Sequence, residues 1–291
     1  MLAGLISAMR PKQWTKNGII FGGLIFAFKL GQPRLVGLSI AAFILFCLLS
    51  SATYLINDIS DLEQDRKHPL KKRRPLASGL IRPVHAAIAA TLLLAIGLPL
   101  AFAVGPAFGL TALAYVALTL AYSAYLKHIV IIDVFTIAAG FVLRAAAGAL
   151  AVDVPISPWL YVCTILGALF LGLTKRRHEL LLLNDHASKH RRILAEYSPY
   201  LLDQMIMIVT STTLIAYSLY TFSAENLPKN HAMMVTIPFV LYGIFRYLYL
   251  VHQKDAGGSP EEVLLRDRPL IADILLWGAT SIAVLYLFRG Q

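Results

Sequence analysis

The chain has 291 residues, of which 58% are hydrophobic and only 14% are charged, and its mean hydropathy is +0.68. Soluble globular domains are about 45–50% apolar and about 25% charged, so this composition excludes an ordinary soluble domain and indicates a polytopic membrane protein. The 26 Lys and Arg residues outnumber the 16 Asp and Glu residues, which gives a formal net charge of +10. Because the cytoplasmic loops of membrane proteins collect Lys and Arg, this excess does not indicate nucleic-acid binding.

The short apolar stretch at the N-terminus is followed, not preceded, by the basic residues Arg10, Lys12 and Lys16, so we expect residues 1–13 to form an interfacial helix and no cleavable signal. Apolar runs bounded by charges, Pro or Gly follow, and a span takes about 20 residues. They predict transmembrane helices at 17–31, 35–57, 84–104, 108–126, 130–151, 158–174, 202–222, 232–251 and 269–288. We therefore expect an all-α, polytopic integral membrane bundle of about nine transmembrane helices, with residues 1–291 as a single transmembrane helical domain.

The basic residues are distributed unevenly over the connections between these spans. With the N-terminus inside, 20 of the 26 Lys and Arg residues fall on the inner side, four on the outer side, and two, Arg144 and Arg246, within spans. Since basic loops are cytoplasmic, this distribution predicts a cytoplasmic N-terminus and an outer C-terminus. The long polar loops 58–82 and 175–201 would then share the cytoplasmic face.

The second predicted span ends in a group of oxygen-bearing side chains. At about 100° per residue, Asn57, Asp58, Asp61 and Asp65 fall on one helical face, whereas Glu63 points away. Mg²⁺ binds one or two carboxylates together with water and phosphate oxygens. The pattern predicts a Mg²⁺-diphosphate site with Asp58, Asp61 and Asp65 as catalytic carboxylates and Asn57 as a further metal ligand. The alternative is a solvated acidic turn.

Basic segments surround this acidic face. One follows it directly, from Arg66 to Pro75, and a second, Lys175-Arg176-Arg177-His178-Glu179, ends the sixth predicted span. Two N–H groups of an arginine guanidinium can bind two phosphate oxygens at once, which predicts phosphate binding at these segments. The alternative is a positive-inside anchor on anionic lipid headgroups.

The fifth predicted span carries a charge deep in the membrane. Asp133, Gly140 and Arg144 lie within about 20° of one line on this helix, with Arg144 about 16 Å deeper than Asp133. An arginine at this depth usually faces a polar cavity or a partner, so we expect Arg144 to reach a lipid phosphate or to fix Asp133. Alternatively, Gly140 and Gly148 serve close helix packing.

The chain resembles the UbiA superfamily of intramembrane prenyl-group transferases over essentially its whole length. The resemblance is carried by the motif Asn57-Asp58-x-x-Asp61-x-x-x-Asp65, the nine predicted spans and the basic inner face. Within that superfamily the chain is most similar to the decaprenyl-phosphate phosphoribosyltransferases. The stretches that carry this second resemblance are Arg10 to Asn17, His68-Pro69, Arg74-Pro75, Tyr122-Ser123, Leu126-Lys127, Ser157-Pro158-Trp159, Lys175 to Glu179 and Glu262 to Leu265.

The resemblance implies a UbiA-like bundle and Mg²⁺-dependent transfer of 5-phosphoribose from 5-phosphoribose 1-diphosphate to a polyprenyl phosphate, with release of diphosphate. It also implies a role in cell-wall arabinan synthesis. Aromatic prenyltransferases of the superfamily normally carry a second DxxxD between spans six and seven, but here that loop offers three cations with Glu179, Asn184 and Asp185. The candidate substrate-binding residues are Lys16, Asn57, Arg73, Arg74, Tyr122, Lys127, Asp133, Arg144, Lys175, Arg176, Arg177 and Glu179.

Two alternative functions remain open at this point. One is a UbiA-type transfer of a prenyl group from an allylic diphosphate to an aromatic or quinone-precursor acceptor. The other is a transporter, which predicts charges scattered through several spans, although only Arg144 is truly deep. We expect the lipid bilayer and two anionic substrates as partners, no nucleic acid, and a location in the cell (inner) membrane with the active site facing the cytoplasm.

Overall fold

The computed structural model describes residues 2–155, 158–183, 192–224, 227–254, 258 and 260–288, and all regular structure within these ranges is helical. This confirms the all-α fold class. In chain order the elements are α1 (Leu2–Ala8), η1 (Pro11–Phe21), α2 (Gly22–Phe26), α3 (Pro33–Ser60), α4 (Leu62–Lys67), η2 (Lys71–Arg73), α5 (Pro83–Val104), α6 (Pro106–Ala124), η3 (Leu126–His128), α7 (Ile132–Ala151), α8 (Pro158–Leu183), η5 (Arg192–Glu196), α10 (Pro199–Ser223), η6 (Ala232–Thr236), α11 (Ile237–Gln253), α12 (Pro260–Arg266) and α13 (Arg268–Leu287).

Seven segments of the described chain are long and apolar enough to cross a membrane. They are α3, α5, α6, α7, α10, the continuous segment Ala232–Gln253 and α13. The predicted span 158–174 forms the first part of α8, a helix of 26 residues that continues to Leu183. The prediction of a multi-pass membrane protein is therefore confirmed, while the count of nine spans is only approximate.

Residues 17–31, which were predicted to form the first transmembrane helix, do not form one continuous α-helix. Residues Pro11–Phe21 form a 3₁₀ helix, and only the five residues Gly22–Phe26 form an α-helix. This tighter coil lies directly against α7, because a Cβ atom added to Gly148 would be 2.0 Å from the carbonyl oxygen of Ile20. Gly148 therefore serves close backbone packing, which is one of the alternatives that the sequence left open.

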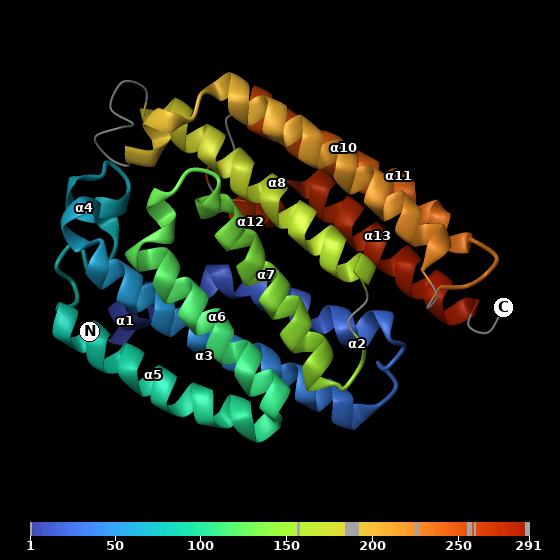
Figure 1. The fold of residues 1–291 in the computed structure, drawn as a ribbon, viewed down its shortest axis with the longest axis horizontal. Coiled ribbons are helices and arrows are strands. Elements are labelled where there is room, and N and C mark those ends of the chain that lie inside the picture. The colour runs from blue at the N-terminus through green and yellow to red at the C-terminus, as the bar shows by residue number, and fades with distance from the viewer. Residues whose placement is uncertain are drawn as a thin grey trace.

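The helices are packed so that α7 and α8 lie in the middle of the bundle (Figure 1). α3 packs against α5 and α6, α6 against α7, α7 against α8, and α8 against α10, while α11 packs against α13. The C-terminal ends of α3, α6 and α8 lie at the same end of the bundle as α4 and the start of α7, at the upper left of Figure 1. Polar residues that are far apart in the sequence therefore meet at this end.

The outward faces of the bundle are apolar. Only 17% of the apolar window of α5 is buried within the chain, and Leu92 and Ile96 on this helix are 56% and 54% exposed. In a bilayer such side chains contact lipid and not water, so their exposure is expected for a helix at the edge of a membrane bundle. The polar residues are gathered inside, where the site lies.

Candidate functional site

A cavity of about 290 Å³ is lined by residues of α3, α6, α7 and α8, and by Gln64 of α4. Eight of the residues that line it carry a positive charge, and two carry a carboxylate. The cations are Arg10, Lys16, Lys71, Arg74, Lys127, Arg144, Lys175 and Arg176, and the carboxylates are Asp61 and Glu179. Such an excess of cations in a concave site favours anionic ligands.

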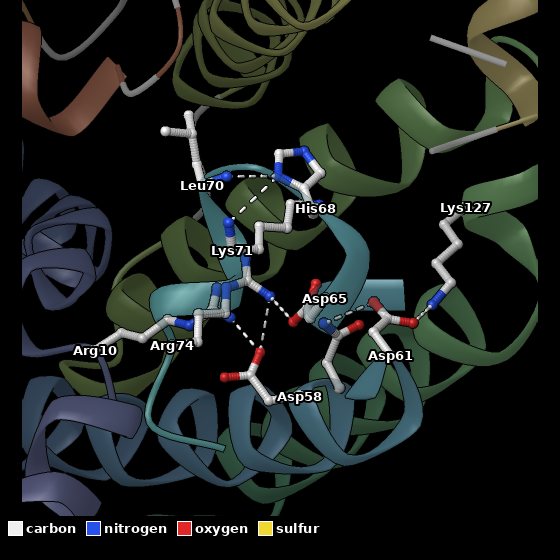
Figure 2. A network of polar contacts seen from close by, with 10 residues as sticks. Arg10, Asp58, Asp61, Asp65, His68, Leu70, Lys71, Arg74 and Lys127 are labelled. Carbon is white, nitrogen blue, oxygen red and sulfur yellow. Dashed lines mark hydrogen bonds and ion pairs between the residues drawn. The ribbon is translucent and has the colours of Figure 1, made fainter. Parts of the chain in front are cut away.

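The acidic face forms as predicted, although the helix that carries it is interrupted between α3 and α4. The Asp61 N–H donates to the Asn57 carbonyl at 2.9 Å, and the Asp65 N–H donates to the Asp61 carbonyl at 2.8 Å. These bonds preserve the helical register, so Asp58, Asp61 and Asp65 stay on one side of the chain (Figure 2). Glu63 is 74% exposed and points away from them.

Two guanidinium groups hold the buried part of this face (Figure 2). Arg10 and Arg74 both donate to the same oxygen of Asp58, Arg74 at 3.1 Å. Arg74 also donates to Asp65 at 2.5 Å. Asp58 and Asp65 are buried, whereas the two arginines line the cavity. The arginines therefore stand between these carboxylates and the cavity and present their own charge to it.

The third carboxylate of the acidic face, Asp61, faces the cavity directly. Lys127 donates to one of its oxygens, and the Asn57 amide donates to the other at 3.2 Å. Lys127 lies on η3, between α6 and α7, and is 66 positions from Asp61 in the sequence. Only the packing of α6 beside α3 brings the two together.

The acidic face fits a hard divalent cation by its chemistry, since Mg²⁺ binds carboxylate and phosphate oxygens. Asp61 lines the cavity, and Asp58 Oδ2 is a buried acceptor with no hydrogen-bond partner among the described residues. Within that same part of the chain, no three His, Cys, Asp or Glu side chains converge on one metal position. A bound metal would therefore use one or two of these carboxylates and complete its coordination with ligand and water oxygens.

Arg176 is the centre of a buried ion-pair network. Its Nε donates to Asp133 at 2.6 Å, its Nη1 to Glu179 at 2.5 Å, and its Nη2 to the Tyr122 hydroxyl at 3.1 Å. Only 2% of the Arg176 side chain and none of the Asp133 side chain is exposed. Because two carboxylates already balance the charge of Arg176, its attraction for a substrate phosphate is weakened.

Tyr197, between η5 and α10, supports this network from the other side of Asp133. Its hydroxyl donates to Asp133 at 2.9 Å and accepts the Ile131 N–H at 2.8 Å. Burial, together with the neighbouring Asp133 carboxylate, raises the pKa of Tyr197 to about 12, so the hydroxyl keeps its proton at neutral pH. Ile131 is a β-branched residue with φ of 70°, a strained conformation that this bond stabilises at the start of α7.

Arg144 occupies the deep end of the cavity. Its Nε donates to the Asn17 side chain at 2.7 Å, its Nη1 to the Gly140 carbonyl at 3.0 Å, and its Nη2 to the Tyr115 hydroxyl at 2.7 Å. The guanidinium lies over the rings of Tyr115 and Phe141, at 4.6 and 5.2 Å from their centroids. Arg144 does not fix Asp133, so the structure excludes one of its two predicted roles.

Three predicted substrate-binding residues do not line the cavity. Arg73 lies on η2 and is exposed at the surface. Arg177 is rotated about 100° around α8 from Arg176, so it faces α10, where its Nε donates to Asp203 at 2.5 Å. Asp133 lies behind Arg176 and is fully buried. Neighbouring positions in a basic run thus face different surroundings, because helical rotation separates them.

The other predicted substrate-binding residues do line the cavity. They are Lys16, Asn57, Arg74, Tyr122, Lys127, Arg144, Lys175, Arg176 and Glu179. Asn184 and Asp185, which the sequence offered in place of a second DxxxD, lie outside the described residues.

The polar groups at the site that were not among the predicted site residues include Arg10, Asn17 and Tyr115. Arg10 precedes Pro11 and has φ of 57°, a strained backbone conformation that is uncommon outside glycine. Asn17 and Tyr115 are polar groups within apolar runs, which is the signal that could have identified them.

Comparison with known proteins places this fold and site in context. The chain matches the UbiA homolog from Archaeoglobus fulgidus that was solved bound to GPP and Mg²⁺, with a TM-score of 0.73 and 19% identity over 97% of this chain and 99% of that chain. It is 33% identical to decaprenyl-phosphate phosphoribosyltransferase of Mycolicibacterium smegmatis, over 98% of this chain and 93% of the relative. It is 35% identical to the protein of that name from Corynebacterium glutamicum, over 98% of this chain and 87% of the relative.

The fold, the cation-rich cavity and these relatives define a multi-pass membrane transferase. The family model described as the UbiA prenyltransferase family matches residues 18–262. The chain belongs to the UbiA prenyltransferase family.

Proposed function

We propose that the chain transfers 5-phosphoribose from 5-phosphoribose 1-diphosphate to a polyprenyl phosphate and releases diphosphate, with Mg²⁺ as cofactor. The observation that carries this proposal is the charge of the cavity, where eight cations and two carboxylates line one space. Both substrates of this reaction carry phosphate, whereas the acceptor of an aromatic prenyltransferase carries none. A cavity with this charge suits two phosphate-bearing substrates better than one.

The relatives support the same assignment. The proteins from M. smegmatis and C. glutamicum are named decaprenyl-phosphate phosphoribosyltransferase and align with nearly the whole chain. A polyprenyl chain of the decaprenyl type is therefore the first acceptor to test. The A. fulgidus homolog was solved with GPP and Mg²⁺, which supports a diphosphate substrate and a divalent cation in this fold.

The acidic face is the proposed metal site, and a bound Mg²⁺ would neutralise the charge that develops on the diphosphate leaving group. In the structure, Arg10, Arg74 and Lys127 hold these carboxylates. With a metal bound to the carboxylates, these three cations would be available to bind the diphosphate oxygens. This exchange keeps every buried charge paired before and after binding, which avoids the large cost of an isolated charge. The candidate ligands are Asn57, Asp58, Asp61 and Asp65, of which Mg²⁺ would use one or two carboxylates at a time.

The chain needs no general base for the proposed step. An oxygen of the lipid phosphate attacks C1 of the ribose, the bond from C1 to the diphosphate oxygen breaks, and the configuration at C1 inverts through an oxocarbenium-like state. The second pKa of a phosphate monoester is about 6, so this nucleophile is already ionised at neutral pH. The residues of the cavity therefore act by binding, orienting and neutralising charge.

Product analysis tests the proposed reaction. The purified protein is incubated with labelled 5-phosphoribose 1-diphosphate, Mg²⁺ and a panel of polyprenyl phosphates, and the lipids are identified by mass spectrometry. We expect polyprenylphosphoryl-5-phosphoribose with Mg²⁺ present, and none after chelation of divalent cations. A folded protein that forms no such lipid under these conditions contradicts the proposal.

A second candidate, the transfer of a prenyl group to an aromatic acceptor, is favoured by one observation, the GPP bound in the A. fulgidus homolog. The same assay with an allylic diphosphate and a quinone precursor distinguishes the two. A prenylated aromatic product without phosphoribosyl transfer establishes this candidate in place of the first.

We further propose that the cavity opens to the cytoplasm, so that the ribosyl donor arrives from the cytoplasm and the lipid phosphate arrives laterally from the inner leaflet. Ser78 belongs to the segment between η2 and α5, which begins at the cavity residue Arg74, and Asn230 belongs to the segment between α10 and η6; both residues are exposed. Single cysteines at these positions, with Cys47 and Cys163 changed to Ala, test this orientation. An impermeant thiol reagent is expected to label Asn230→Cys on intact cells, and Ser78→Cys only after the membrane is opened. Labelling of Ser78→Cys from outside overturns the orientation.

A further inference from the structure

We infer that Arg144 is a preorganised binding site for a phosphate monoester at the deep end of the cavity. The side chain is 5% exposed and lies about 16 Å along α7 from Asp133, yet it lines the cavity. The inference rests on the proposed function only for the source of its ligand. That reaction offers two phosphate monoesters, the headgroup of the lipid acceptor and the 5-phosphate of the ribosyl donor, and both present the same dianionic group.

Arg144 has no acidic hydrogen-bond partner among the described residues. Among the described residues, every hydrogen-bond partner of Arg144 is neutral, namely Asn17, Tyr115 and the Gly140 carbonyl. Arg176, the other arginine buried at this cavity, is bound by two carboxylates. A guanidinium without a counter-charge is costly in a membrane interior, and an anion that binds there removes much of this cost.

The Arg144 guanidinium keeps N–H donors that could bind a phosphate. A guanidinium carries five N–H donors, and three of those on Arg144 are used. One N–H on each terminal nitrogen has no partner within the described chain, and the side chain faces the cavity. Two donors on adjacent nitrogens form the fork that binds two phosphate oxygens at once.

Neighbouring side chains hold the Arg144 guanidinium rigidly in place. Asn17 is fully buried, and its amide nitrogen is near Cys47 Sγ at 3.2 Å and Ser50 Oγ at 3.4 Å. These contacts turn the Asn17 oxygen toward Arg144. The rings of Tyr115 and Phe141 hold the guanidinium plane from its faces. A group that is held in this way loses little conformational freedom when an anion binds.

The decisive substitution is Arg144→Met, which removes the charge and keeps an extended side chain. No carboxylate loses its partner, but the buried Asn17 oxygen loses its donor, so we expect this protein to fold with a midpoint of thermal unfolding close to that of the wild type. The affinity for the ligand whose monoester binds Arg144 is expected to fall by about 100-fold. Arg144→Lys keeps the charge but loses the fork, and it is expected to bind more tightly than Arg144→Met and more weakly than the wild type.

Arg246→Met is the matched control. Arg246 is also a cation within a membrane helix, but it binds both oxygens of Asp267, at 3.1 and 2.8 Å, and it does not line the cavity. We expect this substitution to lower the midpoint of unfolding and to leave both ligand affinities unchanged.

Binding is measured on the full chain in detergent, with each substrate alone so that no turnover is needed. Labelled 5-phosphoribose 1-diphosphate with Mg²⁺ and a polyprenyl phosphate are used in separate titrations, and the titration that weakens in Arg144→Met identifies the source of the monoester. Inorganic phosphate is the third probe, and it is expected to raise the midpoint of unfolding of the wild type but not of Arg144→Met. This arm tests the Arg144 site even where neither substrate binds the wild type, an outcome that would reject the proposed function alone.

Two results overturn the inference. One is a folded Arg144→Met protein that binds both substrates as tightly as the wild type and whose midpoint of unfolding rises as much with inorganic phosphate. The other is unfolding of Arg144→Met to the same extent as Arg246→Met, which would make Arg144 part of the structural framework.

Discussion

Replacement of Asp61 by Asn is expected to reduce phosphoribosyl transfer by roughly 10³-fold while the protein stays folded. Of the three carboxylates on the acidic face, Asp61 alone lines the cavity, and the substitution removes its charge with almost no change in volume. Lys127 loses its counter-charge, but it also faces the cavity, where water and substrate oxygens replace that partner. The rate is measured with labelled donor at saturating Mg²⁺, and the midpoint of thermal unfolding is recorded on the same samples.

Glu63→Gln is the control for this substitution. Glu63 lies two residues further along the chain and carries the same type of charge, but it is 74% exposed and pairs with Arg66 on the surface. Exposed pairs of this kind contribute at most about 1 kcal/mol, so turnover and stability are expected to stay at wild-type levels. If both folded variants lost activity equally, the assignment of the acidic face to metal and diphosphate would be rejected.

Arg176→Ala is expected to destabilise the protein by about 3–5 kcal/mol, because it removes the ion pair of a fully buried carboxylate, Asp133. Asp133 has no exposed surface and is bound by Arg176 at 2.6 Å. Even a loss at the lower end of this range is a large part of the stability of a typical domain. The measurement is the midpoint of thermal unfolding in detergent, together with the yield of monodisperse protein.

Arg177→Ala is the matched control one position along α8. Its partner Asp203 is 37% exposed, so the loss is expected to stay within about 1 kcal/mol. Replacing Asp133 and Arg176 together by apolar residues is expected to recover part of the stability that Arg176→Ala loses, since neither charge is then left alone. An Arg176→Ala protein with wild-type stability and a raised KM for either substrate would instead make Arg176 a phosphate ligand, as the basic run alone indicates.

Much of the architecture could be predicted because its signals are local. Apolar runs of about 20 residues identify membrane helices without reference to neighbouring helices. The spacing of Asp58, Asp61 and Asp65 places them on one face through helical geometry alone. The first span could not be predicted in the same way, since residues 11–21 form a 3₁₀ helix against α7 and an apolar composition does not distinguish that form from an α-helix.

The roles of the basic residues could not be predicted, because a positive charge in the sequence carries no information about its counter-charge. Arg176 and Arg177 are neighbours in the chain, yet one is buried between two carboxylates and the other binds α10. Arg144 obtains its partners from η1 and α6, and Lys127 pairs with a carboxylate 66 residues away.

The sequence by itself therefore determined the membrane class, the positions of most spans, the acidic face and the excess of positive charge. Only the tertiary structure decided which cations are neutralised, which line the cavity and which one lies deep without a counter-charge. The physical reason is the distance along the chain over which each interaction acts. Hydropathy and helical rotation act over a few neighbouring residues, whereas the energy of a buried charge depends on groups that helix packing brings within a few ångströms from distant parts of the chain.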